Sequence, residues 1–484
     1  MDITMTMIGE GVYLINVILA IIIIFRQRRD IAAIWAWLLV LFLLPVIGFV
    51  IYAFLGRQLP KNKLFKVKSD VQLQLDELLA QQRQELGTEN LPADLVSDSV
   101  KSLVKMFQTA NHAFLARKNR VRIIADGKQL FHEMIEDIER AKSSVHIEFY
   151  AFKNDQIGKK IRDLLVRKAL AGVEVRVIYD PFGSLGAFRS FFKSLIDAGG
   201  YVEPFLARSA IMDFRLNFRD HRKIVVVDGR VGYVGGFNIG DQYLGRSKKF
   251  GYWRDTHLRI TGSAVFGLQG RFILDWNATA SEGLLPADHI ETRYFPLTHV
   301  KGDTNMQIVS SGPDSDLQQI KMGYIRLIQS AKKRVWIQSP YLIPDDSVMD
   351  AIRIAVMAGV DVRIMIPQMP DHPFVYRATQ YYAHELAKDG VKIYYYENGF
   401  IHSKTMVVDD RLASVGSANM DYRSFKLNFE VNAFLYDEKL AVQLAELFEK
   451  DQRLSRLMTA EAFDNQSLYL RFKQSFCRLL SPIL

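Results

Sequence analysis

The stretch His221-Arg222-Lys223-Ile224-Val225-Val226-Val227-Asp228-Gly229 decides the fold of this chain. Its run of β-branched residues predicts a strand, and the Asp-Gly pair predicts a tight turn after it. Side chains alternate between the two faces of a strand, so His221 and Lys223 point the same way. We therefore expect an imidazole and an ammonium group side by side, with the Asp228 carboxylate at the end of the strand.

The same spacing returns 181 positions later (402 minus 221), in His402, Lys404 and Asp409. The repeat continues at that offset in two further pairs, Gly235 with Gly416 and Asn238 with Asn419. Upstream, residues 171–177 match residues 358–364 at another offset, because the loops differ in length. The chain is therefore predicted to hold two similar α/β halves, each built on a central sheet.

Length, charge and cysteine usage narrow the class of protein. A chain of 484 residues, 49% of them hydrophobic, has room for two or three domains and a large core. The net charge of +9 favours anionic partners such as nucleic acid, phosphates or an acidic membrane surface. Cys477 is the only cysteine and there is no H-E-x-x-H motif, so no disulfide, metal or other cofactor is expected.

Two uncharged apolar runs, residues 11–25 and 31–55, occupy the N-terminal region. The second run is long enough to span a bilayer with some tilt, and the first is long enough if it includes residues 3–10. Arginines at 26, 28 and 29 separate the runs, which predicts a transmembrane helical hairpin within residues 1–56. A signal peptide is the alternative for the first run, and a buried core hairpin is the alternative for both.

The charges around this hairpin disagree about its orientation. The three arginines favour a cytoplasmic connection, whereas Arg57 and the lysines between residues 61 and 68 favour keeping the following region inside. We expect a multi-pass protein of the cell (inner or plasma) membrane, with the rest of the chain on the cytoplasmic face. There the same cations would contact anionic headgroups.

The motif H-x-K-x4-D followed by G-x-x-N, present twice, resembles the phospholipase D superfamily from about residue 121 onward. Together with the N-terminal apolar runs, the layout is similar to that of bacterial cardiolipin synthases. The resemblance implies an α/β fold of two similar phospholipase D-like halves with pseudo-two-fold symmetry, preceded by the transmembrane helical hairpin. The first copy departs from the family at Gly236, where the family has serine; the second copy keeps Ser417.

Composition then suggests the domain boundaries. The polar, proline-containing stretch 282–305 separates the two halves. We expect, in order, two transmembrane helices (1–56), a helical connector (57–120), the first catalytic half (121–295) and the second (296–484).

A pseudo-two-fold arrangement would bring His221, Lys223, His402 and Lys404 into one pocket. This set suits a phosphodiester, because the lysines stabilise charge on the phosphoryl oxygens without a metal. One histidine attacks phosphorus, and the other exchanges protons with the leaving and entering alcohols. The residues leave the order open; the resemblance assigns His221 as nucleophile and His402 as acid and base.

Amides and glycines are expected to support the phosphate. Asn238 and Asn419 would donate hydrogen bonds to it, while Gly235 and Gly416 would let the backbone approach it. Ser417 would add a hydroxyl in the second half.

Each histidine also needs a carboxylate to fix its tautomer. The resemblance implies that Asp255 and Glu430 orient the histidines, and that Asp228 and Asp409 organise their own strands and turns. Because the last two belong to the motif, we include them among the catalytic residues. A plain turn residue is the alternative for Asp228.

Through this resemblance, the leading hypothesis is a membrane-bound cardiolipin synthase. It would transfer a phosphatidyl group from one phosphatidylglycerol to another and release glycerol, through a phosphatidyl-histidine. A phospholipase D hydrolase would use water at the same core, and a phosphatidylserine synthase would use serine. A membrane-tethered nuclease and a catalytically dead lipid-binding protein are further alternatives. The hairpin argues against a nucleic-acid partner, and two complete motifs argue against a dead site.

Two further stretches are open to two interpretations. The aromatic stretch 182–192 would pack in the core or meet acyl chains. The tail, residues 468–484, mixes apolar and basic residues, which fits an interfacial amphipathic helix or a packed C-terminal helix equally.

Overall fold

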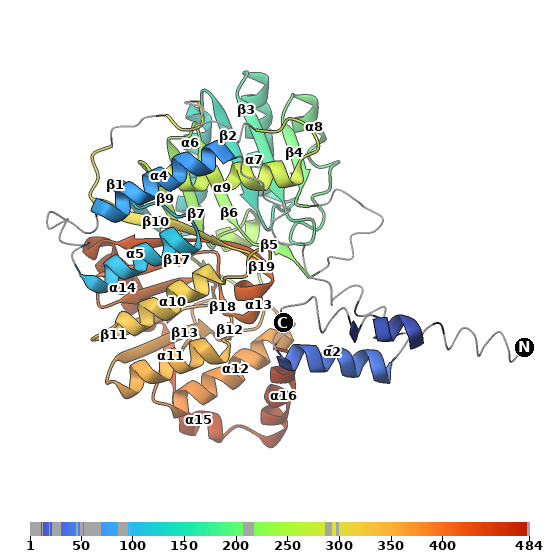
Figure 1. The fold of residues 1–484 in the computed structure, drawn as a ribbon, viewed down its shortest axis with the longest axis vertical. Coiled ribbons are helices and arrows are strands. Elements are labelled where there is room, and N and C mark those ends of the chain that lie inside the picture. The colour runs from blue at the N-terminus through green and yellow to red at the C-terminus, as the bar shows by residue number, and fades with distance from the viewer. Residues whose placement is uncertain are drawn as a thin grey trace, which may run out of the picture.

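The computed structural model describes residues 69–85, 95, 97–206, 217–285, 293–296 and 300–481, and residues 11–21 and 31–52 in part. Two α/β halves lie end to end along the longest axis of the molecule (Figure 1). Their strands join into one continuous sheet. The two predicted α/β halves are therefore present.

The first half contributes seven strands to the main path of this sheet. From the centre outward they are β1 (Ala116–Ile124), β9 (His257–Thr261), β7 (Val231–Gly235), β6 (Lys223–Val227), β2 (Ser144–Phe149), β3 (Glu174–Tyr179) and β4 (Tyr201–Pro204).

The second half repeats this order from the centre outward. Its strands are β10 (Thr304–Ser311), β19 (Asn428–Tyr436), β17 (Leu412–Gly416), β16 (Thr405–Val408), β11 (Arg334–Gln338), β13 (Asp361–Pro367) and β14 (Lys392–Tyr396), with β20 (Ser455–Met458) added at the edge. At the centre β1 and β10 pair antiparallel, with Ala116 opposite Met306. This strand order is the pseudo-two-fold relationship expected from the sequence.

Helices cover both faces of the sheet. The first half carries α6 (Gly127–Arg140), α7 (Gln156–Leu170), α8 (Lys193–Asp197) and α9 (Ala264–Thr279). The second half carries α10 (Gln319–Ser330), α11 (Asp346–Met357), α12 (Pro373–Lys388), α13 (Tyr422–Lys426), α14 (Glu438–Gln452), α15 (Ala460–Asp464) and α16 (Leu468–Leu479).

The motif strand β6 is buried on both faces. Val225 and Val227 belong to the hydrophobic cluster under α6 and α7, whereas Ile224 and Val226 belong to the cluster on the opposite face. A run of β-branched residues without alternation fits a strand covered on both sides. Packing on both faces therefore fixes the orientation of β6, including that of its first residue, Lys223.

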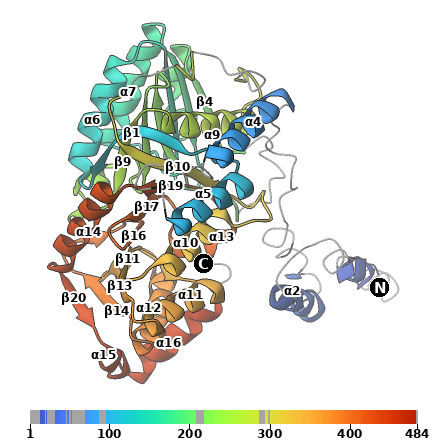
Figure 2. The same ribbon diagram turned by 60° about the vertical axis from the view of Figure 1, so that its left-hand side comes forward.

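Helices α4 (Ser69–Glu85) and α5 (Asp98–Ala110) lie between the N-terminal region and the first strand. Helix α5 starts at a cap in which Ser97 accepts a hydrogen bond from the Val100 N–H, and its buried face joins the core of the second half. Figure 2 shows α5 beside α10. Strand β1 begins at Ala116, ahead of the boundary predicted at residue 121.

The N-terminal region is described only in part. Helix α2 (Ile31–Leu43) is 13 residues long and entirely uncharged. Within the described part of the chain, no helix combines the length and apolar character needed to cross a bilayer. The arginines between the predicted spans, Arg57 and the lysines from 61 to 68 lie outside the described residues.

Two short parallel strand pairs cross between the halves. β5 (Arg219–Asp220) pairs with the start of β19, and β8 (Trp253–Arg254) pairs with β15 (Phe400–Ile401). Gly399 permits the second crossing: its φ is +93°, and a Cβ there would lie 2.2 Å from the carbonyl oxygen of Tyr252. These crossings bring the regions around the two motif histidines together.

Candidate active site

Each motif histidine is held by an acid from the other half. Nδ1 of His221 lies 2.9 and 3.0 Å from the two carboxylate oxygens of Glu430. Nδ1 of His402 lies 2.7 Å from Oδ2 of Asp255. The two histidine–acid pairs are therefore crossed between the halves.

The crossing strands create this arrangement through their register. In the β5–β19 pair Asp220 stands opposite Phe429, so the next residues, His221 and Glu430, are neighbours. The His221 N–H donates to the carbonyl of Phe429 at 2.9 Å. In the same way, His402 follows β15 and donates its N–H to the carbonyl of Arg254 at 2.7 Å, beside Asp255.

Both motif lysines are buried next to their histidines. Lys223 is fully buried and Lys404 is 2% exposed. The Lys223 ammonium donates a hydrogen bond to the carbonyl of His221 at 2.6 Å. The Lys404 ammonium donates to the carbonyl of His402 and also lies 2.8 Å from Nδ1 of the His402 ring. Lys404 also lowers the pKa values of Lys223 and His221 by charge repulsion, so the two motifs share one electrostatic environment.

Burial sets the protonation of this cluster. It lowers the pKa of both histidines to about 4, against the attraction of their carboxylates. Both rings are consequently neutral near pH 7, the form that attacks phosphorus. Burial also lowers the pKa of Lys223 to about 7 and that of Lys404 to about 8.

The two acids stay ionised despite their burial. Burial pushes the pKa of Asp255 upward, but Lys404 and His402 outweigh it and leave that pKa below its ordinary value. For Glu430, His221 and Lys223 likewise outweigh burial. The two ionised carboxylates thus lie beside the two motif lysines in a buried site.

Ser417 and Gly236, the matched positions that differ, both face an acid. The Ser417 hydroxyl donates to Glu430, which also accepts from Nδ2 of Asn428 at 3.2 Å. In the first half, a Cβ at Gly236 would lie 2.0 Å from Oδ1 of Asp255. The departure from the family serine therefore makes room for the acid. The Ser417 hydroxyl is engaged by Glu430 in this structure, and its role in phosphate binding stays a prediction.

The two glycines of the repeat and Asn238 all contact the surrounding structure closely. A Cβ at Gly235 would lie 2.5 Å from the Thr256 carbonyl oxygen, and one at Gly416 would lie 2.2 Å from Oδ1 of Asn432, so neighbouring strands require both glycines. Asn238 accepts from the N–H of Ala151 and donates to the hydroxyl of Tyr243, each at 3.1 Å.

Its counterpart Asn419 is 3% exposed. Its Oδ1 has no hydrogen-bond partner among the described residues. The two matched amides therefore differ in how fully the protein satisfies them.

Asp228 and Asp409 follow the far ends of their motif strands, where their carboxylates bind backbone N–H groups, as expected for residues that organise their own strands and turns. The Asp228 carboxylate accepts from the N–H groups of Lys142, Ser143 and Ser144 at 2.7–3.2 Å. Asp409 accepts from the equivalent N–H groups of residues 332–334. Lys223 and Asp228 stand at opposite ends of β6, roughly 16 Å apart at the usual rise per residue. These aspartates fasten the strand ends together.

Sequence reasoning missed two tyrosines and an arginine at the site. The rings of Tyr150 and His221 meet edge to face, with their centroids 5.1 Å apart. Tyr341 donates a hydrogen bond to Asp371, whose negative charge partly offsets the burial that lowers the pKa of His402. Both tyrosines follow the carboxyl end of a strand, β2 or β11, where α/β proteins place their sites. Arg222, which stands between His221 and Lys223 in the chain, is 1% exposed and donates a hydrogen bond to Asp275 at 2.8 Å.

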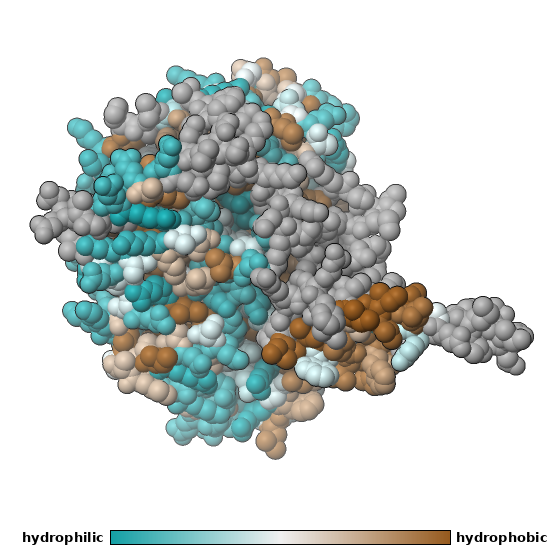
Figure 3. All heavy atoms as spheres, in the orientation of Figure 1, coloured by the Kyte–Doolittle hydropathy of each residue, from teal (hydrophilic) through white to brown (hydrophobic). Residues whose placement is uncertain are grey.

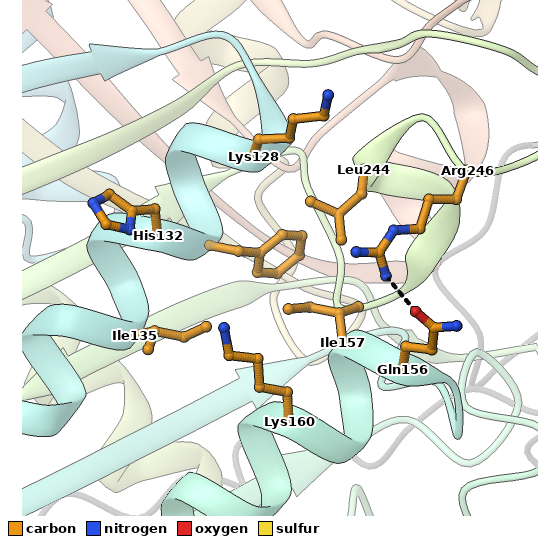
Figure 4. A pocket seen from close by; sticks show the side chains of 9 residues that line it. Lys128, His132, Ile135, Gln156, Ile157, Lys160, Leu244 and Arg246 are labelled. Carbon is orange, nitrogen blue, oxygen red and sulfur yellow. Dashed lines mark hydrogen bonds between the residues drawn. The ribbon is translucent and has the colours of Figure 1, made fainter.

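A separate surface pocket lies in the first half. It is lined by Lys128, Phe131, His132, Ile135, Gln156, Ile157, Lys160, Leu244 and Arg246. Figure 4 shows the Arg246 guanidinium reaching Gln156 across its rim, at 3.1 Å. None of the predicted site residues lines it.

Comparison with known proteins identifies the family. A family model described as "cardiolipin synthase, PLD-like domain" matches residues 134–251 and 324–452, one match in each half. The cardiolipin synthase of Listeria innocua is 49% identical over 97% of this chain and 98% of its own length. The chain belongs to the cardiolipin synthases of the phospholipase D superfamily. A further relative in this family, the major cardiolipin synthase of Bacillus subtilis, is 48% identical over 98% of both chains.

Two other similarities concern the fold and the N-terminal region. The crystal structure of a phosphatidylserine synthase from Haemophilus influenzae aligns with 79% of this chain and all of its own, with a TM-score of 0.60 at 15% identity. It supports the two-half α/β fold alone. A second family model, "phospholipase D-nuclease N-terminal", matches residues 14–57, where the sequence predicts the membrane hairpin.

Proposed function

We propose that this chain joins two phosphatidylglycerol molecules into cardiolipin and releases glycerol. The observation that carries the proposal is the pair of crossed contacts, His221 with Glu430 and His402 with Asp255, in a chain of the cardiolipin synthase family. The contacts leave one free ring nitrogen, Nε2, on each histidine. A phosphodiester between them meets a nucleophile on one side and a proton donor on the other.

In the first step, Nε2 of His221 attacks the phosphorus of the donor lipid. The bond from phosphorus to the glycerol oxygen breaks, and His402 gives its proton to that oxygen, so glycerol leaves. The negative phosphodiester raises the pKa of His402 when it binds, so the ring takes up a proton from solvent and then donates it to the glycerol oxygen. Lys223 and Lys404 stabilise the charge on the phosphoryl oxygens.

In the second step, His402 removes the proton from a glycerol hydroxyl of the second lipid. That oxygen attacks phosphorus, the bond from phosphorus to His221 breaks, and cardiolipin forms. Glu430 stabilises the positive charge on the His221 ring while the intermediate exists, and Asp255 does the same for protonated His402. The resemblance to the family sets this order of the two histidines.

The hydrolase and phosphatidylserine synthase alternatives use the same first step. They differ in the acceptor, water or serine, and the high identity to cardiolipin synthases favours a lipid alcohol. We further propose that residues 1–56 form a membrane hairpin with the catalytic halves on the cytoplasmic face. The boundaries at 57–120, 121–295 and 296–484 remain our proposed division of the rest.

The test is purified full-length protein with phosphatidylglycerol that carries label in its headgroup glycerol and in its acyl chains. We expect labelled cardiolipin and free glycerol in equal amounts. Phosphatidic acid as the sole lipid product would identify a hydrolase, and a serine-dependent product would identify a phosphatidylserine synthase. Either result would overturn the proposal.

A further inference from the structure

Helix α16 packs with its apolar side outward. Its buried side chains are Gln474 and Cys477, at 2% and 5% exposure. The outward residues are large and apolar: Leu468, Phe472, Phe476 and Leu479, at 82%, 67%, 50% and 72% exposure. At about 100° per residue, their spacing of four, four and three keeps them on one face. A helix on a soluble body normally shows the reverse pattern.

Basic residues flank this apolar face on both edges. Arg471 and Arg478 follow one edge and Lys473 the other, and residues 468–479 include no acid. The Lys473 ammonium lies 4.2 Å from the centre of the Tyr469 ring. The helix is well formed, since Ser467 caps its first turn by accepting from the Leu470 N–H. An apolar face between rows of cations is complementary to the surface of an anionic bilayer.

The helix also lies on the side of the second half that carries the site. Cys477 packs with Ile343 and Ala378, and Ile343 pairs with Asp421 in the short β12–β18 ladder (β12 Leu342–Ile343, β18 Met420–Asp421). Burial lowers the pKa of Lys404, and Asp421 lies close enough for its charge to oppose that effect. Figures 1 and 2 both show α16 packed along α12 at the outer end of the second half. In Figure 3, brown hydrophobic residues are visible on the surface at the bottom of the view, where the outer end of the second half lies.

We infer that α16 is an interfacial docking helix, which lays its leucine and phenylalanine face into the headgroup region of an anionic bilayer. It holds the second half against the membrane surface from which lipid enters. The cations on both edges and the absence of acids favour lipid headgroups over a protein partner. The inference rests on the proposed function only for the statement that lipid enters here.

The first test measures depth in the membrane without turnover. In a Cys477→Ala background, Leu479→Cys in the full-length chain carries an environment-sensitive fluorophore, and Leu170→Cys is the matched control. Both leucines are 72% exposed, and Leu170 ends α7, at the opposite end of the sheet from the site. The vesicles contain phosphatidylglycerol and a lipid whose acyl chain carries a spin-label quencher close to the headgroup.

We expect strong quenching at position 479 and little at 170, with the difference shrinking when a neutral lipid replaces phosphatidylglycerol. Equal quenching at both positions would overturn the inference. So would an apolar fluorescence signal at 479 that the lipid-borne quencher does not reduce, which would indicate a protein partner or a second copy. Because neither readout uses turnover, failure of the proposed function leaves this test intact.

The second test separates docking from chemistry. Phe472→Glu with Leu479→Glu should lower turnover of phosphatidylglycerol in vesicles by about tenfold or more, because the charged face no longer enters the bilayer. Turnover of the same lipid in detergent micelles should stay within about twofold. Leu170→Glu with Met357→Glu is the control and should change neither. Equal losses in vesicles and micelles, or no loss in either, would contradict docking by α16.

Discussion

Nδ1 of His221 lies 2.9 Å from Oε1 of Glu430, which follows it by 209 positions in the chain. Nδ1 of His402 bonds in turn to Asp255, 147 positions before it. Neither motif histidine takes its acid from its own half. The halves must therefore stay in register with each other for either histidine to be oriented.

Glu430→Gln should lower kcat by about 10²- to 10⁴-fold while the protein stays folded, because the neutral amide no longer fixes the His221 tautomer or stabilises its positive form. Cardiolipin formation and thermal melting measure the two effects. Glu397→Gln is the control, since that acid forms a half-exposed surface pair with Arg456. A kcat for Glu430→Gln within twofold of the unmodified protein would contradict the role of the crossed pair.

Asp228→Asn should destabilise the fold by about 1–3 kcal/mol and leave kcat per folded molecule nearly unchanged. The reason is that three backbone N–H groups lose a charged acceptor far from the chemistry. Chemical denaturation and active-site-normalised turnover give the two numbers, and Asp409→Asn should behave alike. A hundredfold loss of kcat without loss of stability would instead support a catalytic role for Asp228.

Gly236→Ala should disrupt the pair formed by His402 and Asp255, although Gly236 lies in the other half from His402. The new Cβ would press on Asp255, whose Oδ1 lies 2.0 Å from its position, and so displace the partner of His402. We expect kcat to fall by about tenfold or more, since the acid loses its geometry. The matched control is Gly270→Ala, where a Cβ meets nothing within 4 Å. Equal activity of the two variants would contradict this account of Gly236.

The value of kcat/KM should fall as the pH rises through about 7 to 8. The free enzyme binds the anionic lipid through protonated Lys223 and Lys404, whose pKa values are about 7 and 8, and each loses its charge above its own pKa. The bound phosphate raises both pKa values, so kcat should change less over this range.

Lys223→Arg provides the control, because its guanidinium stays charged throughout. Its remaining activity should lack the first part of the decline. An unchanged profile in that variant would show that another group titrates.

The sequence reveals the two halves because the motif repeats and the matched stretches 171–177 and 358–364 precede it in the same order. It also places Asp255 and Glu430 near the histidines through the family resemblance. It does not reveal which acid serves which histidine, because the crossing depends on two-residue strands that carry no periodic signal of their own. Asp228 illustrates a further limit: the strand pattern places its carboxylate at the end of β6, but it does not show which distant backbone N–H groups that carboxylate binds.

The most direct test of the composite site is a single turnover with phosphorus-labelled phosphatidylglycerol, stopped with a quench that preserves phosphohistidine and followed by peptide mapping. We predict transient label on His221, and in Glu430→Gln about a hundredfold slower appearance of that label, although the acid belongs to the other half. Label that never appears on His221, or that forms at the unmodified rate without Glu430, would contradict the account.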